Sequence, residues 1–241
     1  MAPKSSSYQI SALPVTVMAH LLVVAIFTLV LVWLLHFRHG LAFKSDNKQK
    51  IFNASSLSKV LTSYIHPLLM VSFILLMGEG SNWILIKTAV MAYKSVLATR
   101  KIQKIVHLVL HLLALVAGVL GVYAVFKFHH EIRAPDMYTL HSWLGISTIA
   151  LFGLQWLLGF FSFVFPGAQS FRRAGYLPWH IFGGMVIFFM AILTAETGLV
   201  QRFIFLGLRR SQEALIVNFT GLLILLFAIA VGLTGVLPRA Y

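Results

Sequence analysis

The stretch HLVLHLLALVAGVLGVYAVF, residues 107–126, decides the fold of this chain. It contains no acidic residue, no lysine and no arginine, and its polar groups are two histidines and one tyrosine hydroxyl. A helix needs about 20 mostly apolar residues to cross the hydrocarbon core of a bilayer. The stretch therefore predicts a membrane-spanning helix, which we expect to cover residues 106–128.

Five further apolar segments of similar length predict five more spans. They cover residues 11–35, 66–93, 141–165, 180–200 and 214–237. Hydrophobic residues make up 59% of the 241 residues and charged residues 10%, whereas soluble domains carry roughly 45–50% and about 25%. One core of this size cannot bury so much apolar surface. We therefore expect a single all-α domain over residues 1–241, an integral membrane six-helix bundle.

The absence of cysteine excludes several kinds of site. The chain has no disulfide, no iron–sulfur cluster, no thiolate zinc site and no C-x-x-C-H haem attachment. It also lacks the glycine-rich motifs that bind dinucleotides and nucleoside triphosphates. The net charge is +13, and the basic residues lie almost entirely between the apolar runs. We therefore expect a lipid bilayer and anionic small molecules as partners, and no nucleic acid.

Four of the ten histidines begin four successive predicted spans, namely His66, His107, His141 and His180. Consecutive spans run antiparallel, so His66 and His141 should lie near one membrane face and His107 and His180 near the other. Polar side chains inside a bilayer are costly and usually functional. Two neutral imidazoles on facing helices suit the two axial positions of a b-type haem. The pattern predicts two such sites about 20 Å apart.

Other interpretations of the histidines stay open at this point. A histidine at a helix start can simply anchor the helix at the membrane interface. Zinc is the competing metal, but it usually takes three or four ligands, and each face offers only two clear ones. His111 lies one turn after His107 and is an alternative ligand, although we expect it to pack nearby. His20, in the middle of the first span, fits a histidine of the core.

Two other functions are compatible with six spans. One is a transporter without enzymatic activity, and the other is a haem b subunit of a quinone-linked complex. Transporters typically place ionisable groups at mid-membrane, yet Glu79 and Glu196 are the only carboxylates expected inside the spans. The basic residues just before His107 favour a water-soluble anion over a quinone.

A family resemblance is carried by ten short stretches in order along the chain. They are LAFKSDNKQKIFN (41–53), HPLLM (66–70), MGE (77–79), AYKSV (92–96), KIVHL (104–108), KFH (127–129), YTLHSWLG (138–145), LQW (154–156), FPG (165–167) and LPWHIF (177–182). In these stretches the chain resembles the cytochrome b561 family of ascorbate-dependent transmembrane electron carriers, especially its plant members. The resemblance implies two haem b groups, and both termini in the cytosol. His66 and His141 would hold the non-cytoplasmic haem, and His107 and His180 the cytoplasmic one.

The resemblance also implies the substrates and where they bind. Cytosolic ascorbate would give single electrons to monodehydroascorbate or a ferric chelate on the opposite side. The family positions that match Lys104 and Arg173 bind ascorbate, and Arg100 and Lys101 lie beside Lys104. On the far side, His129 matches a residue of the second substrate site, and Tyr138 is close in sequence.

The same resemblance implies an oxidoreductase of the ascorbate ferrireductase or monodehydroascorbate reductase type, and a homodimer. We expect it in the vacuolar membrane or another endomembrane, with the plasma membrane as the alternative. Two stretches depart from the family pattern, near residues 54–65 and 80–88, and both look like in-frame insertions. With the second, residues 66–93 would form a helix about 42 Å long, against a core of about 30 Å. This helix must tilt, protrude or break, and the ascorbate site that follows it could be displaced.

Overall fold

The computed structural model describes residues 13–37, 66–80 and 100–236, which are almost entirely helical, and within 100–236 short loops join the helices. The helices are α1 (Leu13–Val32) with its short π-helical continuation η1 (Trp33–Phe37), an unlabelled helix His66–Gly80, α4 (Arg100–Ile132), α5 (Leu140–Phe163), α6 (Ser170–Phe205) and α7 (Gln212–Val236). Within the described ranges, five helices are long and apolar enough to cross a membrane. The expected all-α membrane bundle is confirmed. The stretches 54–65 and 81–88 lie outside the described residues.

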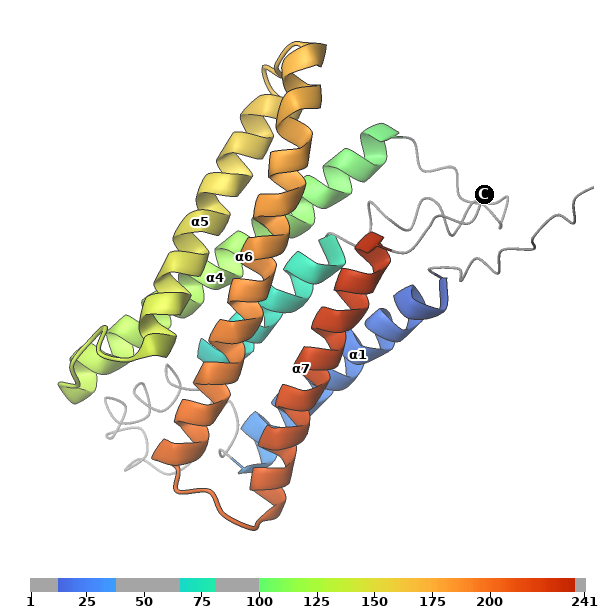
Figure 1. Ribbon diagram of the computed structural model, residues 1–241. Coiled ribbons are helices and arrows are strands. Elements are labelled where there is room, and N and C mark those ends of the chain that lie inside the picture. The colour runs from blue at the N-terminus through green and yellow to red at the C-terminus, as the bar shows by residue number, and fades with distance from the viewer. Residues whose placement is uncertain (1–12, 38–65, 81–99, 237–241) are drawn as a thin grey trace, which may run out of the picture.

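The helices share one elongated bundle (Figure 1). α6 packs against α5 on one side and α7 on the other, while α7 also packs against α1 and α5 against α4. The helix His66–Gly80 lies inside the bundle and contacts α4, α6 and α7. Its Phe73 approaches Gly118 of α4, and its Gly78 approaches Phe188 of α6 and Phe227 of α7. Four helices, namely this one, α4, α5 and α6, therefore carry the four predicted histidine ligands.

Large apolar side chains cover the outside of the bundle. Leu21, Tyr123, Phe182 and Val200 are each more than half exposed, although they come from three different helices. Water would penalise so much exposed apolar surface, whereas lipid tails solvate it. The outer surface therefore supports the assignment to the membrane.

The interior is apolar, with a few paired polar groups. Phe188, Ile224 and Phe227 are almost completely buried where α6 meets α7. Trp33 Nε1 donates a hydrogen bond to Glu213 Oε1 at 2.9 Å, which joins the end of α1 to the start of α7. His20 Nδ1 lies 2.8 Å from Glu79 Oε2 and joins the middle of α1 to the helix His66–Gly80, but the His20 side chain is 43% exposed, so it is not the core histidine that the sequence predicts. Such pairing satisfies polar groups that lipid could not.

Helix α6 extends well beyond the span expected at residues 180–200. It begins at Ser170, ten residues before His180, and ends at Phe205. Its first turns carry Arg172 and Arg173 and continue through Pro178, so hydropathy alone could not find the true start. A proline inside a helix removes one backbone donor, and a helix tolerates this where neighbouring groups take up the freed carbonyl.

We predict that Gly78→Ala destabilises the bundle. A Cβ at this position would lie 2.4 Å from Phe227 Cζ and 3.3 Å from Phe188 Cε2, and both rings are too buried to give way. Overpacking of this kind typically costs about 1–3 kcal/mol. Tryptophan fluorescence during heating in detergent should show a lower midpoint. Gly175→Ala is the matched control, because a Cβ there meets no atom within 4 Å. Equal midpoints for the two variants would contradict the prediction.

Candidate functional site: two histidine pairs

The four histidines that begin predicted spans meet in two pairs. The ring centroids of His66 and His141 are 6.2 Å apart, and those of His107 and His180 are also 6.2 Å apart. A metal held at about 2 Å by one nitrogen of each ring would put the centroids about 6 Å apart, because each nitrogen lies about 1.1 Å from its ring centre. Both pairs therefore have the spacing that two nitrogen ligands of one metal would need.

Each of these rings is oriented by a hydrogen-bond partner at Nδ1. His66 donates to the carbonyl oxygen of Gly121 at 2.8 Å, His107 to that of Gly80 at 3.1 Å, and His141 to that of Thr194 at 2.9 Å. The partner of His180 Nδ1 is a side chain, the amide of Gln155, at 3.1 Å. At His66, His107 and His141 the proton held at Nδ1 leaves Nε2 as the free lone pair that a metal requires, whereas at His180 the Gln155 nitrogen donates to Nδ1.

These partners follow one spacing rule on all four helices. On each helix, the residue that contacts a neighbour's histidine lies fourteen positions after that helix's own histidine: Gly80 after His66, Gly121 after His107, Gln155 after His141, Thr194 after His180. Fourteen residues rise about 21 Å along a helix and return to nearly the same face. The two pairs therefore lie at two levels of the bundle, about 21 Å apart along the helix axes.

The surroundings of the two pairs leave room for a flat group. A Cβ at Gly198 would lie 2.7 Å from His141 Cε1, and one at Gly159 would lie 3.0 Å from His180 Cε1. The first pair opens into a mostly apolar cavity of about 240 Å³, slightly below the roughly 300–1,000 Å³ of a typical small-molecule pocket. Its lining includes Phe73 and Leu199. These residues fit a haem, with two imidazoles, an apolar wall and close glycines.

A zinc site fits these residues less well. Among the residues that the structure describes, no group of three or more histidine, cysteine or carboxylate side chains could hold a metal ion. His111, the alternative ligand, has its Nδ1 bonded to the His107 carbonyl oxygen at 3.0 Å. Its ring stacks on Phe152, with a centroid distance of 5.6 Å. His111 therefore supports the neighbouring His107 as part of the packing.

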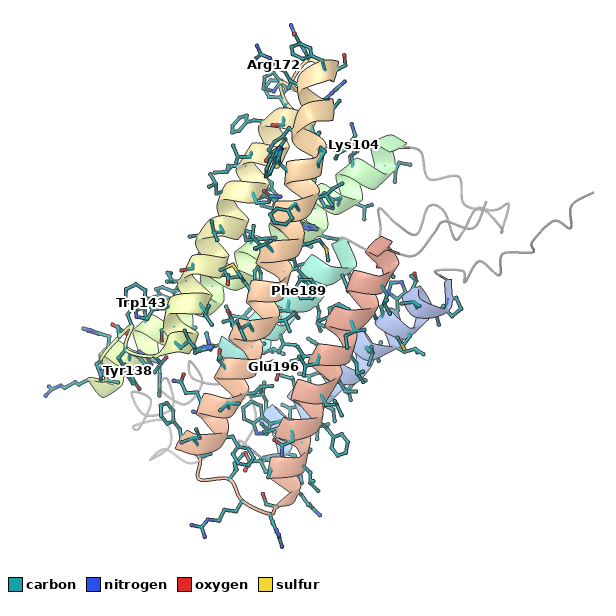
Figure 2. All side chains as sticks on the ribbon, in the orientation of Figure 1. Lys104, Tyr138, Trp143, Arg172, Phe189 and Glu196 are labelled. Carbon is teal, nitrogen blue, oxygen red and sulfur yellow. The ribbon has the colours of Figure 1, made fainter. Side chains whose placement is uncertain are left out.

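The basic residues predicted to bind ascorbate belong to the level of His107 and His180. Lys104 is exposed on α4, three residues before His107, and Arg173 is half-buried on α6, seven residues before His180. Figure 2 shows Lys104 and Arg172 toward one end of the bundle, and Tyr138 and Trp143 toward the other. Arg100 and Lys101 lie in the first turn of α4, but their side chains are outside the described part. This end therefore presents positive charge close to one histidine pair.

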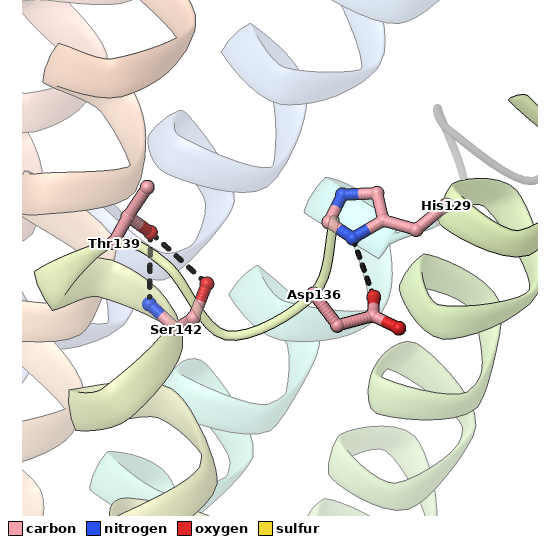
Figure 3. A network of polar contacts seen from close by, with 4 residues as sticks. All are labelled: His129, Asp136, Thr139 and Ser142. Atoms are coloured by element: carbon pink, nitrogen blue, oxygen red, sulfur yellow. Dashed lines mark hydrogen bonds and ion pairs between the residues drawn. The ribbon is translucent and has the colours of Figure 1, made fainter. Parts of the chain in front are cut away.

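The opposite end presents His129 and the loop between α4 and α5. His129 Nδ1 lies 2.7 Å from Asp136 Oδ1 (Figure 3). Both residues line the mouth of the His66–His141 cavity. The loop has two non-glycine residues with positive φ, Arg133 at 55° and Met137 at 57°, and such backbone often marks functional loops. Tyr138 is 55% exposed beside it. This end offers polar groups that a soluble molecule can reach.

Three residues of the site were missed by the sequence analysis. Gln155 was quoted only within a family stretch, although an amide inside an apolar span is itself a signal. Asp136 was overlooked because its contact with His129 depends on a loop bend that no sequence motif predicts. Tyr176 lies next to His180, with ring centroids 5.9 Å apart. Its buried hydroxyl has no hydrogen-bond partner among the described residues, so a bound group with a polar edge would satisfy it.

Comparisons with known proteins identify relatives over nearly the full chain. Residues 65–206 match the family model of eukaryotic cytochrome b561. A rice protein named probable ascorbate-specific transmembrane electron transporter 1 is 44% identical, covering 95% of this chain and 92% of the rice protein. The Arabidopsis thaliana transmembrane ascorbate ferrireductase 1 is 38% identical, covering 94% and 89%.

A human transmembrane ascorbate-dependent reductase is 37% identical and covers 83% of this chain and 72% of the human protein. The matched residues 65–206 include all four paired histidines and exceed half of the chain. Both the family match and the near full-length relatives point the same way. The chain belongs to the eukaryotic cytochrome b561 family.

Proposed function

We propose that this protein is a dihaem oxidoreductase that moves single electrons from ascorbate across a membrane. One observation carries the proposal: two histidine pairs, each with 6.2 Å between ring centroids, lie at two levels about 21 Å apart. The names of the relatives supply ascorbate as the electron donor and ferric reduction as the activity. A path between two metal centres at opposite ends of a membrane bundle suits transmembrane electron transfer.

Two haem b groups per chain are proposed, one held by His66 and His141 and one by His107 and His180. Haem b supplies an iron that changes oxidation state by one electron without releasing its ligands. The chain contributes the rest. The hydrogen bonds at Nδ1 fix the orientation of each imidazole, and apolar residues such as Phe73 exclude water from the cavity. Little reorganisation is then needed when the charge changes.

Ascorbate is proposed to bind beside the His107–His180 pair. It is a monoanion at neutral pH, so a site needs positive charge and hydrogen-bond donors. Lys104 and Arg173 supply both and flank the two histidines, with Arg100 and Lys101 as supporting cations. An arginine fork and a lysine can together hold an anion at the protein surface. This face would be cytosolic, and both termini would lie on it.

The electron acceptor is proposed to bind at the opposite end, near His129 and Tyr138. The His129–Asp136 pair at 2.7 Å lies at the mouth of the other cavity, where a soluble molecule can come close to the histidine pair. Monodehydroascorbate and ferric chelates are the proposed acceptors. We place the protein in the vacuolar membrane or another endomembrane, as a homodimer; neither proposal is needed for the electron path within one chain.

The first prediction for this function is that replacing one ligand histidine removes one of the two haems and leaves the other. His107→Ala removes one axial ligand, so the purified protein should keep only the haem at the other level. His111→Ala should retain both, because His111 acts only by packing. His130→Ala, which changes an exposed residue, is the control. Haem is counted by the pyridine haemochrome spectrum against protein mass. A His107→Ala protein that still holds two bis-histidine haems would refute the assignment.

The second prediction separates an ascorbate carrier from a quinone-linked subunit. Lys104→Ala and Arg173→Ala should each raise the ascorbate concentration for half-maximal haem reduction by about tenfold or more, since a hydrogen bond to a charged group contributes about 1.5–3 kcal/mol. Reduction by dithionite should be unchanged. Arg172→Ala is the matched control, because Arg172 is the neighbouring, exposed cation on the same helix, stacked over Phe171. Unaltered ascorbate reduction in both variants would favour the quinone alternative.

The third prediction concerns the acceptor end. Asp136→Asn removes the charge that holds the His129 ring, so electron delivery to monodehydroascorbate or a ferric chelate should slow several-fold. Reduction of the haems by ascorbate should stay at the wild-type rate, because it takes place at the other level. Stopped-flow absorbance follows both steps separately. Slowing of the ascorbate step instead would show that the two ends are assigned the wrong way round.

A further inference from the structure

Gln155 breaks an otherwise uniform pattern in the bundle. The Nδ1 atoms of His66, His107 and His141 contact main-chain carbonyl oxygens, which no substitution of a side chain can remove. His180 alone among the four contacts a side chain, the amide of Gln155, whose nitrogen lies 3.1 Å from Nδ1. The same nitrogen donates to the His180 carbonyl oxygen at 2.6 Å.

The chain makes room for this amide on the facing helix. Gln155 comes from α5, and the two successive glycines Gly183 and Gly184 of α6 lie against it. A Cβ at Gly183 would be 3.4 Å from Gln155 Oε1, and one at Gly184 would be 3.7 Å from Nε2. One turn after Gln155, Gly159 leaves space for the His180 ring itself. The amide is therefore enclosed between two helices and can exchange its nitrogen and oxygen by turning about its Cγ–Cδ bond.

The protonation of His180 decides which amide atom faces it. Iron binds the lone pair of Nε2, so a ligating His180 carries its proton on Nδ1. An amide NH₂ cannot accept that proton's hydrogen bond, whereas the amide oxygen can. In the haem-bound protein the Gln155 amide must therefore turn its oxygen toward Nδ1, where it takes the role that main-chain carbonyls play at the other three ligands. The side chain must also draw back from the His180 carbonyl oxygen, to which Nε2 donates at 2.6 Å, because two acceptor oxygens repel each other at that distance.

We propose that Gln155 is a positioning residue that accepts the Nδ1 proton of His180 and thereby sets the reduction potential of the haem at the His107–His180 level. The proposal rests on the function proposed above. An acceptor at Nδ1 makes the imidazole a stronger electron donor to iron and favours the ferric state. The strength of this acceptor thus adjusts how readily the haem nearest ascorbate takes an electron.

Two substitutions of Gln155 should shift the potential in opposite directions. Gln155→Leu removes the acceptor at similar volume, so one of the two haem midpoint potentials should rise. Gln155→Glu offers a stronger, charged acceptor, so the same midpoint should fall. For each we expect about a tenfold change in the electron equilibrium between the two haems, which is about 59 mV for a one-electron couple. The other midpoint should stay at its wild-type value and serves as an internal reference.

The measurement is a spectroelectrochemical redox titration of the full-length purified protein, with the low-spin haem signals followed in parallel by electron paramagnetic resonance. Thr220→Val is the matched control. It removes a buried intramembrane hydroxyl on α7, which donates to the Ile216 carbonyl oxygen at 2.8 Å, and neither midpoint should move. A disturbance that is only structural would shift both Gln155 variants in one direction, so opposite signs support the proposal.

The outcomes separate this proposal from the proposed function. If the wild-type protein holds two haems that ascorbate reduces, but both Gln155 variants keep wild-type midpoints or shift in the same direction, the role of Gln155 is refuted and the function stands. If Gln155→Leu loses its haem, Gln155→Glu still tests the proposal: a lower midpoint potential supports it, and an unchanged or higher one refutes it. A wild-type protein with fewer than two haems, or with haems that ascorbate does not reduce, overturns the function and this proposal together.

Discussion

The whole arrangement depends on one constraint. A histidine that binds a metal through one ring nitrogen inside a membrane needs a hydrogen-bond acceptor for the N–H of its other ring nitrogen. Lipid offers no acceptor, so the neighbouring helix has to provide one. For His66, His107 and His141 that acceptor is a main-chain carbonyl oxygen at 2.8–3.1 Å. A helix can present a carbonyl at the required height only if its axial position is fixed, so these bonds set the register of the four helices.

This axial register of the helices creates two levels of histidine pairs, because all four helices repeat the same spacing of histidine and hydrogen-bond partner. Each of the four helices carries a histidine for one level and, fourteen residues on, a partner for a histidine of the other level. These contacts are reciprocal within two pairs of neighbouring helices. The helix His66–Gly80 pairs with α4, and α5 pairs with α6. A shift of one helix by one turn would disturb both levels at once. The same contacts thus hold the bundle together and keep the two histidine pairs at a constant separation, as the proposed electron transfer would require.

Much of the fold and part of the site could be predicted from the residues. Hydropathy identifies a membrane bundle, and the alternating direction of spans assigns His66 with His141 and His107 with His180. Helix ends were harder, since α6 begins ten residues before His180 in a stretch where Arg172 and Arg173 lower the hydropathy. Asp136 could not be foreseen as a partner of His129, because the contact depends on a loop that turns through Arg133 and Met137 with positive φ.

The sequence by itself determined that the chain spans a membrane and which histidines are candidate ligands, because hydrophobicity and ligand chemistry are properties of residue types. Only the tertiary structure decided what orients those histidines. Gly80, Gly121 and Thr194 act through carbonyl groups that every residue possesses, so no residue type marks them. Gln155 is the one partner with a chemical identity of its own, yet its role follows only from the approach of α5 to α6. The distance between α5 and α6 depends on the packing of the whole bundle, so the sequence of neither helix alone predicts this contact.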